Sequence, residues 1–219
     1  MAWLKRTWLP ILTHIGALLP LARLIWNFFH DQLTANPIQY ITFQTGKTAL
    51  VLLILALACT PLNTVFELKR VVGLRKQLGL YAFLYATLHF LTFVGLDYQF
   101  DPDLLKEAIF KKRYALVGFA AFLALLPLAI TSTRGWMRRL GKNWKRLHRL
   151  IYLAAVLVII HFVWLVKSDV REPLAYGAVV VVLLALRLKT IRKGLVNLRE
   201  RLAAKRRAYN RVALPEDLR

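Results

Sequence analysis

The sequence predicts an all-α polytopic membrane protein: a bundle of six transmembrane helices with both termini in the cytoplasm. Apolar residues make up 58% of the 219 residues, and the mean hydropathy is +0.49. Soluble domains are usually only roughly 45–50% apolar. The apolar residues gather in blocks of about 17–22 residues, which is the length that a helix needs to cross the hydrocarbon core. The blocks show no alternation with a period of two, which argues against barrel strands.

Six of these blocks are expected to span the membrane as helices. They are residues 8–28, 48–66, 78–96, 114–131, 149–166 and 173–189. The first block begins like a signal peptide. Its apolar run continues past Pro20, carries Arg23 and lacks a clear cleavage site, so we expect it to be retained. Residues 1–190 are therefore expected to form one six-span transmembrane domain, and residues 191–219 a basic cytoplasmic tail.

The charges predict the orientation of the bundle. The formal net charge is +21, from 32 Lys and Arg against 11 Asp and Glu. Two connections are very basic. The first carries Lys69, Arg70, Arg75 and Lys76, and the second carries Arg134, Arg138, Arg139, Lys142, Lys145, Arg146 and Arg149. The positive-inside rule puts these connections and both termini in the cytoplasm. Because the cations lie between apolar blocks, we expect them to contact membrane lipid, with no nucleic acid as a partner.

The tail is expected to form a short basic amphipathic helix that ends before Pro215. A helix lying on the lipid surface is the favoured interpretation. A docking surface for a cytoplasmic electron donor is the alternative. The single cysteine, Cys59, excludes an intramolecular disulfide and an iron–sulfur cluster held by this chain alone. No internal repeat is evident in the sequence.

Two histidines are expected to lie at the same depth in the membrane. His89 lies eleven residues after Leu78, the start of the third block, which is ~16 Å along a helix. His161 lies twelve residues after Arg149, or ~18 Å. On parallel helices the two imidazoles can face each other across one iron, as a six-coordinate haem requires. The alternative is two separate histidines, each hydrogen-bonded to a backbone carbonyl.

The other three histidines are expected to have different roles. His148 precedes His161 by thirteen residues, which is ~20 Å along a helix, so the two cannot bind one iron. His148 is a candidate ligand for a second haem near the cytoplasmic face, and an interfacial histidine is the alternative. His14 is expected to form a hydrogen bond between helices, and His30 to be solvated.

The missing motifs restrict the possible chemistry. There is no C-x-x-C-H motif for covalent haem, so any haem would be of the non-covalent b type. There is also no glycine-rich nucleotide-binding loop and no Walker loop. Electrons must therefore come from another protein, from membrane quinol or through a bound flavin.

Three segments make the chain resemble the MsrQ (YedZ) family, which belongs to the ferric reductase-like transmembrane group. They are ANPIQYITFQTGKTAL, LGLYAFLYATLHF and ITSTRGWMRRLGKNWKRLHRLIYLAAVLVIIHFVW. The resemblance implies a protein of the bacterial inner membrane that binds haem b and FMN. It implies that electrons pass from the quinone pool or a cytoplasmic flavin reductase to a periplasmic molybdopterin subunit, MsrP. That partner, which holds the catalytic site, reduces methionine sulfoxide in periplasmic proteins.

The sequence departs from the two-haem relatives in this group at one point. Where they carry a second histidine on the third span, this chain has Arg75 and Lys76. The resemblance therefore implies one haem on His89 and His161, and it leaves His148 without an obvious partner. A stand-alone ferric reductase-like oxidoreductase is one alternative function. A non-redox membrane transporter or scaffold is another.

Overall fold

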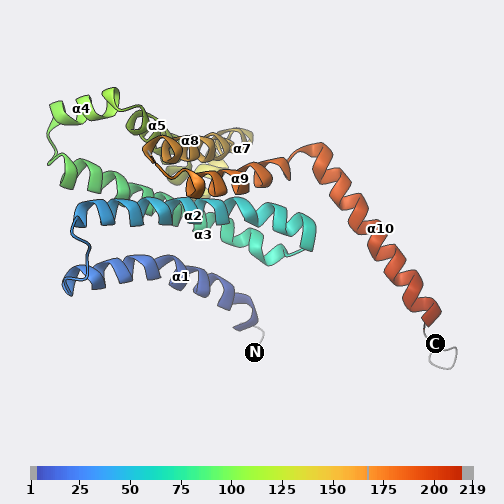
Figure 1. The fold of residues 1–219 in the computed structure, drawn as a ribbon. Coiled ribbons are helices and arrows are strands. Elements are labelled where there is room, and N and C mark those ends of the chain that lie inside the picture. Colours follow the sequence, from blue (N-terminus) through green and yellow to red (C-terminus); the bar gives the residue numbers. More distant parts are fainter. Residues whose placement is uncertain (1–3, 167, 214–219) are drawn as a thin grey trace.

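A computed structural model describes residues 4–166 and 168–213, and within these residues the chain is helical with no strand (Figure 1). The elements in chain order are α1 (Leu4–Phe29), α2 (Pro37–Phe66), α3 (Lys69–Leu91), the π-helix η1 (Thr92–Asp97), α4 (Pro102–Lys111), α5 (Arg113–Ile130), α6 (Arg134–Leu140), α7 (Lys142–Leu147), α8 (Leu150–Leu165), α9 (Arg171–Ala185) and α10 (Lys189–Ala213).

Two helix pairs form the centre of the bundle. α2 packs along α3, and α5 packs along α8, while α9 lies against α8 and α1 against α3 (Figure 1). The loop after α1, helix α4 and the loop before α9 lie together at one end of the bundle, which we call the α4 end. The turn after α2, helices α6 and α7, and the start of α10 lie toward the other end, the α10 end.

The structure confirms a polytopic helical membrane protein. Among the described residues, five helices are long and apolar enough to span a membrane, and a sixth crossing is counted if α9 and α10 are taken as one bent span. The axes of α9 and α10 meet at 75°. The expected last span, 173–189, is therefore wrong at its end: α9 stops at Ala185 and a new helix starts at Lys189. The second span starts at Pro37 rather than residue 48, because the Asn36 side chain accepts a hydrogen bond from the Gln39 backbone and caps the helix there.

An arginine side chain replaces a backbone hydrogen bond that Pro61 cannot make inside α2. Pro61 has no N–H to donate to the carbonyl of Leu57, four residues earlier. The guanidinium of Arg187 donates to that carbonyl and also to the Tyr152 hydroxyl at 2.8 Å. This contact ties the end of α9 to α2 and α8. The bend after α9 is therefore anchored by an arginine that replaces a missing helix hydrogen bond.

A second polar contact attaches α1, which is otherwise poorly buried. The Tyr85 hydroxyl donates to the Ala17 carbonyl at 2.7 Å and accepts from the Leu21 backbone N–H at 3.0 Å. The side chain thus replaces one step of the α1 hydrogen-bond ladder next to Pro20. Nearby, His14 lies 2.7 Å from the Tyr81 hydroxyl and 3.1 Å from the Gln77 amide nitrogen. His14 thus forms the interhelical hydrogen bond that the sequence predicts.

The basic tail forms a helix, as expected, as far as Ala213; residues 214–219 lie outside the described residues. α10 points away from the four central helices (Figure 1). Its Arg199 donates to the carbonyl of Thr64 at 3.0 Å and pairs with Glu67 at 3.1 Å. Since Thr64 is in the last turn of α2, Arg199 satisfies a terminal carbonyl of that helix. One side of the tail helix is therefore fixed to the turn between α2 and α3.

Candidate functional site

The structure brings His89 of α3 and His161 of α8 together inside the bundle. Their ring centres lie 6.1 Å apart and their planes meet at 81°. Two metal–imidazole bonds of about 2 Å each, together with the distance from each nitrogen to its ring centre, add up to about 6 Å. The spacing therefore suits two imidazoles on opposite sides of one metal ion. Both side chains are partly buried. Their closeness agrees with the equal depths that the sequence predicts.

Both rings are held by the same kind of hydrogen bond. His89 Nδ1 lies 2.9 Å from the carbonyl oxygen of Thr42 in α2. His161 Nδ1 lies 2.7 Å from the carbonyl oxygen of Tyr114 in α5. A carbonyl can only accept, so each Nδ1 carries the proton and donates it. The Nε2 lone pair of each neutral imidazole is then available to a metal.

Each ring packs against a glycine one helical turn after the carbonyl to which it donates. A Cβ placed on Gly46 would come 3.0 Å from His89 Nδ1. A Cβ placed on Gly118 would come only 2.6 Å from His161 Nδ1. Because a Cβ tilts toward the N-terminus of its helix, a side chain at either position would cover the accepting carbonyl. The absence of a side chain therefore lets each histidine reach its acceptor.

A cavity of about 1020 Å³ surrounds the two rings and opens at the α4 end. Aromatic side chains form much of its wall: Phe90, Phe93, Phe119, Phe122 and Phe162. Phe90 stacks on Phe122 with ring centres 4.8 Å apart, which closes the side between α3 and α5. Some polar lining residues come from the segments at the α4 end: Asn36, Gln39, Asp97, Tyr98, Lys112, Asp169 and Glu172. Others come from α2 and α5 beside the rings: Tyr40, Thr42, Gln44, Lys47 and Tyr114. Such a cavity suits a flat apolar group with a polar edge.

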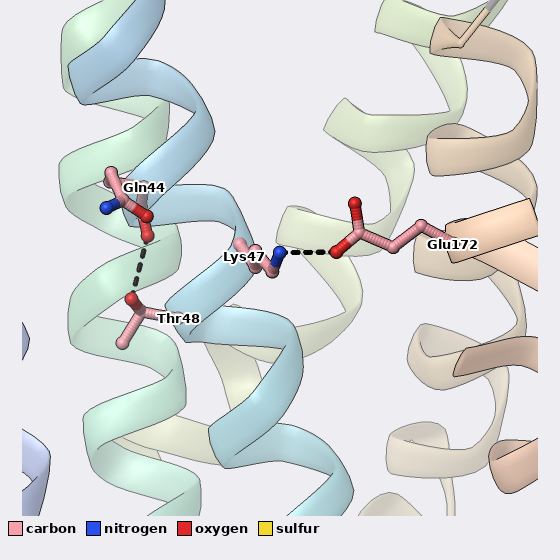
Figure 2. Close-up of polar contacts among 4 residues, drawn as sticks. All are labelled: Gln44, Lys47, Thr48 and Glu172. Carbon is pink, nitrogen blue, oxygen red and sulfur yellow. Dashed lines mark hydrogen bonds and ion pairs between the residues drawn. The ribbon is translucent and has the colours of Figure 1, made fainter. Parts of the chain in front are cut away.

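Two lysines lie on the lining of this cavity. Lys47 of α2 reaches across to Glu172 in the first turn of α9 and forms an ion pair with it (Figure 2). Lys112, between α4 and α5, donates to the Tyr98 hydroxyl at 2.8 Å. That hydrogen bond raises the pKa of the Lys112 ammonium above its ordinary value. Lys112 therefore keeps a positive charge at the opening throughout the neutral pH range.

The structure does not bring His148 into this cavity. His148 follows α7 at the α10 end, where its ring stacks on Trp144 at 3.9 Å. Its Nε2 lies 3.1 Å from the Thr131 hydroxyl. His30 stacks on Trp26 at the α4 end and is exposed, as expected. Among the described residues no three His, Cys, Asp or Glu side chains form a metal site, so His89 and His161 would bind a metal whose other ligands come from a bound group.

Sequence reasoning missed the glycines and the carbonyls, although the sequence contains a signal for them. Gly118 lies 72 residues after Gly46, and His161 lies 72 residues after His89. The two residues whose carbonyls accept the hydrogen bonds, Thr42 and Tyr114, have the same separation. Each histidine lies 47 residues after its carbonyl partner. The helix pairs α2–α3 and α5–α8 thus carry the same contact of a histidine with a carbonyl and a glycine, at the same separations in sequence. No repeat is evident from the sequence as a whole. The likeness between the two helix pairs is confined to a few positions: the carbonyl residue, the glycine and the histidine.

A helical membrane bundle with a pair of histidines between its helices is the arrangement expected of a ferric reductase-like membrane protein, and comparison with known families shows that the chain belongs to this class. The family model described as "Ferric reductase like transmembrane component" matches residues 8–159. A relative from Xanthomonas axonopodis pv. citri (strain 306) is 48% identical over 182 residues, covering 80% of this chain and 84% of the relative. One from Herminiimonas arsenicoxydans is 46% identical over 176 residues, covering 79% of this chain and 81% of the relative. Both are named protein-methionine-sulfoxide reductase heme-binding subunit MsrQ.

The chain belongs to the MsrQ family. No solved structure matches it.

Proposed function

We propose that this protein is a haem b-containing electron-transfer subunit of a membrane-bound methionine sulfoxide reductase system, with its iron held between His89 and His161. The observation that carries the proposal is the 6.1 Å separation of the two rings, each with its Nδ1 proton donated to a backbone carbonyl. The names of the relatives support the same cofactor. When bound, haem supplies reversible one-electron chemistry at iron.

The residues present fit a haem b. The aromatic walls suit the porphyrin, and a cationic Lys112 at the opening suits its propionates. The chain lacks the C-x-x-C-H motif of covalent haem, so the group is held by the two histidines and by packing. The protein orients both imidazoles, keeps the site apolar and places it near the α4 end of the bundle.

The direction of electron flow follows from the proposed orientation. The basic connections at the α10 end put that end and both termini in the cytoplasm, and the α4 end in the periplasm of a bacterium with the chain in its inner membrane. Electrons from the quinone pool or a cytoplasmic flavin reductase would leave at the α4 end to a periplasmic MsrP-like molybdopterin subunit. The methionine sulfoxide site is on that partner. The proposal keeps the division into a transmembrane domain, residues 1–190, and a cytoplasmic tail, residues 191–219. It also includes the FMN that the resemblance implies, but it assigns no residue to FMN.

His148 is the proposed ligand of a second, weaker haem at the α10 end. The positions that would complete its coordination from α3 are Arg75 and Lys76. An arginine has no lone pair for iron, and a lysine must first lose its proton. We therefore expect one firmly bound haem per chain, and any haem at His148 to be substoichiometric.

The test is haem quantification with a visible spectrum on the purified full chain. Wild type should hold about one low-spin haem, which His89→Ala and His161→Ala should each lose while the protein still inserts. The solvated His30 supplies a matched control, since His30→Ala should keep the wild-type spectrum. His148→Ala should also keep about one haem per chain. A colourless wild type would overturn the proposal in favour of a transporter or scaffold, and two firm haems would show that His148 has a partner.

A further inference from the structure

The helix pairs α2–α3 and α5–α8 are alike at more positions than their two histidines. What we infer from this likeness rests on the proposed function. We infer that Gly46 and Gly118 are positioning residues for the haem ligands, and that the iron is held by two copies of one three-part unit. Each unit consists of a carbonyl, a glycine one turn later on the same helix, and a histidine on the paired helix.

The geometry shows why the glycine is needed. In a helix the Thr42 carbonyl already accepts the N–H of Gly46, and its second lone pair faces two side-chain donors, His89 Nδ1 at 2.9 Å and the Thr45 hydroxyl at 3.1 Å. The His89 ring reaches that lone pair by passing over Gly46, whose missing side chain leaves the space. Gly118, Tyr114 and His161 repeat the arrangement. No other pair of helices in the described structure has this combination of a histidine, a carbonyl and a glycine in contact.

A methyl group added at Gly46 or Gly118 should disturb the histidine that packs there, and not the helix that carries the glycine. Alanine is a better helix former than glycine, so a Gly→Ala change alone should not weaken α2 or α5. The methyl would instead occupy the space of the Nδ1–H and its hydrogen bond. A ring pushed away turns its Nε2 off the iron axis, and it loses the bond to the carbonyl that makes the imidazole more basic. A less basic ligand stabilises ferric iron less, so any haem that remains should have a raised midpoint potential.

The two positions should differ in severity. At Gly118 the new Cβ would lie 2.6 Å from Nδ1, a distance that forces the ring to move. At Gly46 the corresponding distance is 3.0 Å, which a small shift can relieve. Gly79 of α3 provides the matched control, because a Cβ there meets nothing within 4 Å.

The experiment measures haem content, the low-temperature electron paramagnetic resonance (EPR) spectrum of the ferric protein and the midpoint potential, all on the full chain. Gly118→Ala should lose haem several-fold or hold it in a high-spin form. Gly46→Ala should keep most of its haem with shifted g values and a raised potential. Gly79→Ala should match wild type. If Gly118→Ala does not accumulate in the membrane, the comparison of Gly46→Ala with wild type and with Gly79→Ala decides whether the glycines position the ligands.

Two results would overturn the inference while leaving the proposed function standing. One is a wild-type spectrum and potential in both Gly46→Ala and Gly118→Ala. The other is an equal disturbance in Gly79→Ala, which would show a general effect of helix substitution. A wild type without low-spin haem would instead remove the proposed function and this inference together.

Discussion

At the scale of single residues, Lys112 is a cation of the cavity opening that no carboxylate neutralises directly in the described structure. Its ammonium donates to the Tyr98 hydroxyl, whereas Lys47 is paired with Glu172. We expect Lys112→Met to speed haem release roughly 2–5-fold, the range for an exposed ion pair worth up to about 1 kcal/mol. The measurement is transfer of haem to an apoprotein acceptor. The neighbouring Lys111, which pairs with Glu107 on α4, gives the control Lys111→Met, with release at the wild-type rate.

The effect of Lys112 on the rate of haem release should persist across the neutral pH range and disappear only at high pH. The hydrogen bond to Tyr98 raises the pKa of Lys112, so the charged form is favoured in the folded protein. Its contribution is then fully present at neutral pH and is lost only as the pH rises through that raised pKa. The ratio of release rates between variant and wild type should stay constant from about pH 6 to 9. A ratio that falls toward one near neutral pH would show that Lys112 is not the group responsible.

The residues that could be predicted from sequence are those whose position depends only on helix rise. The equal depths of His89 and His161 follow from counting residues from the span edges, and the structure brings their rings together. Counting residues from the span edges does not find Gly46 and Gly118, because glycine is common in membrane helices. The 72-residue separation that they share with the two histidines is visible in the sequence, but only the packed structure shows that these two glycines touch the rings. The ion pair between Lys47 and Glu172 joins residues far apart in sequence, and no local pattern indicates it.

At the scale of elements, the contact of Arg187 with the Leu57 carbonyl predicts a coupling to Pro61. Arg187→Met should destabilise the bundle by about 1–3 kcal/mol, because it leaves a buried carbonyl unpaired. In a Pro61→Ala background residue 61 regains an N–H that can donate to Leu57, so the same change should cost less. Unfolding of the four proteins in mixed detergent measures this double-mutant cycle. Equal costs in the two backgrounds would show that Arg187 acts through Tyr152 alone.

The spans themselves were predictable because lipid demands long apolar runs, but their ends were not. α2 extends to Pro37 because the Asn36 cap and the proline start a helix through a partly polar segment. The last span bends after Ala185, where Arg187 is held between α2 and α8. Both boundaries depend on polar contacts that hydropathy cannot indicate.

At the scale of the whole molecule, the proposed orientation predicts which loops can be labelled from outside. Asp103→Cys and Asp169→Cys at the α4 end should react with a membrane-impermeant maleimide in intact spheroplasts. Lys142→Cys at the α10 end should react only after permeabilisation. The one native cysteine, Cys59, is 1% exposed, so the background should be low. Labelling of residue 142 in intact spheroplasts would show that the bundle has the opposite orientation, with the histidine pair near the cytoplasm.

The proposed function depends on His89 and His161 binding the same iron. Near-infrared magnetic circular dichroism of the oxidised full chain tests it most directly, because the charge-transfer band of ferric low-spin haem identifies the pair of axial ligands. We expect a bis-histidine band in wild type and in His148→Ala, and its loss in both His89→Ala and His161→Ala. A bis-histidine band that survives either of the last two substitutions would contradict this ligation.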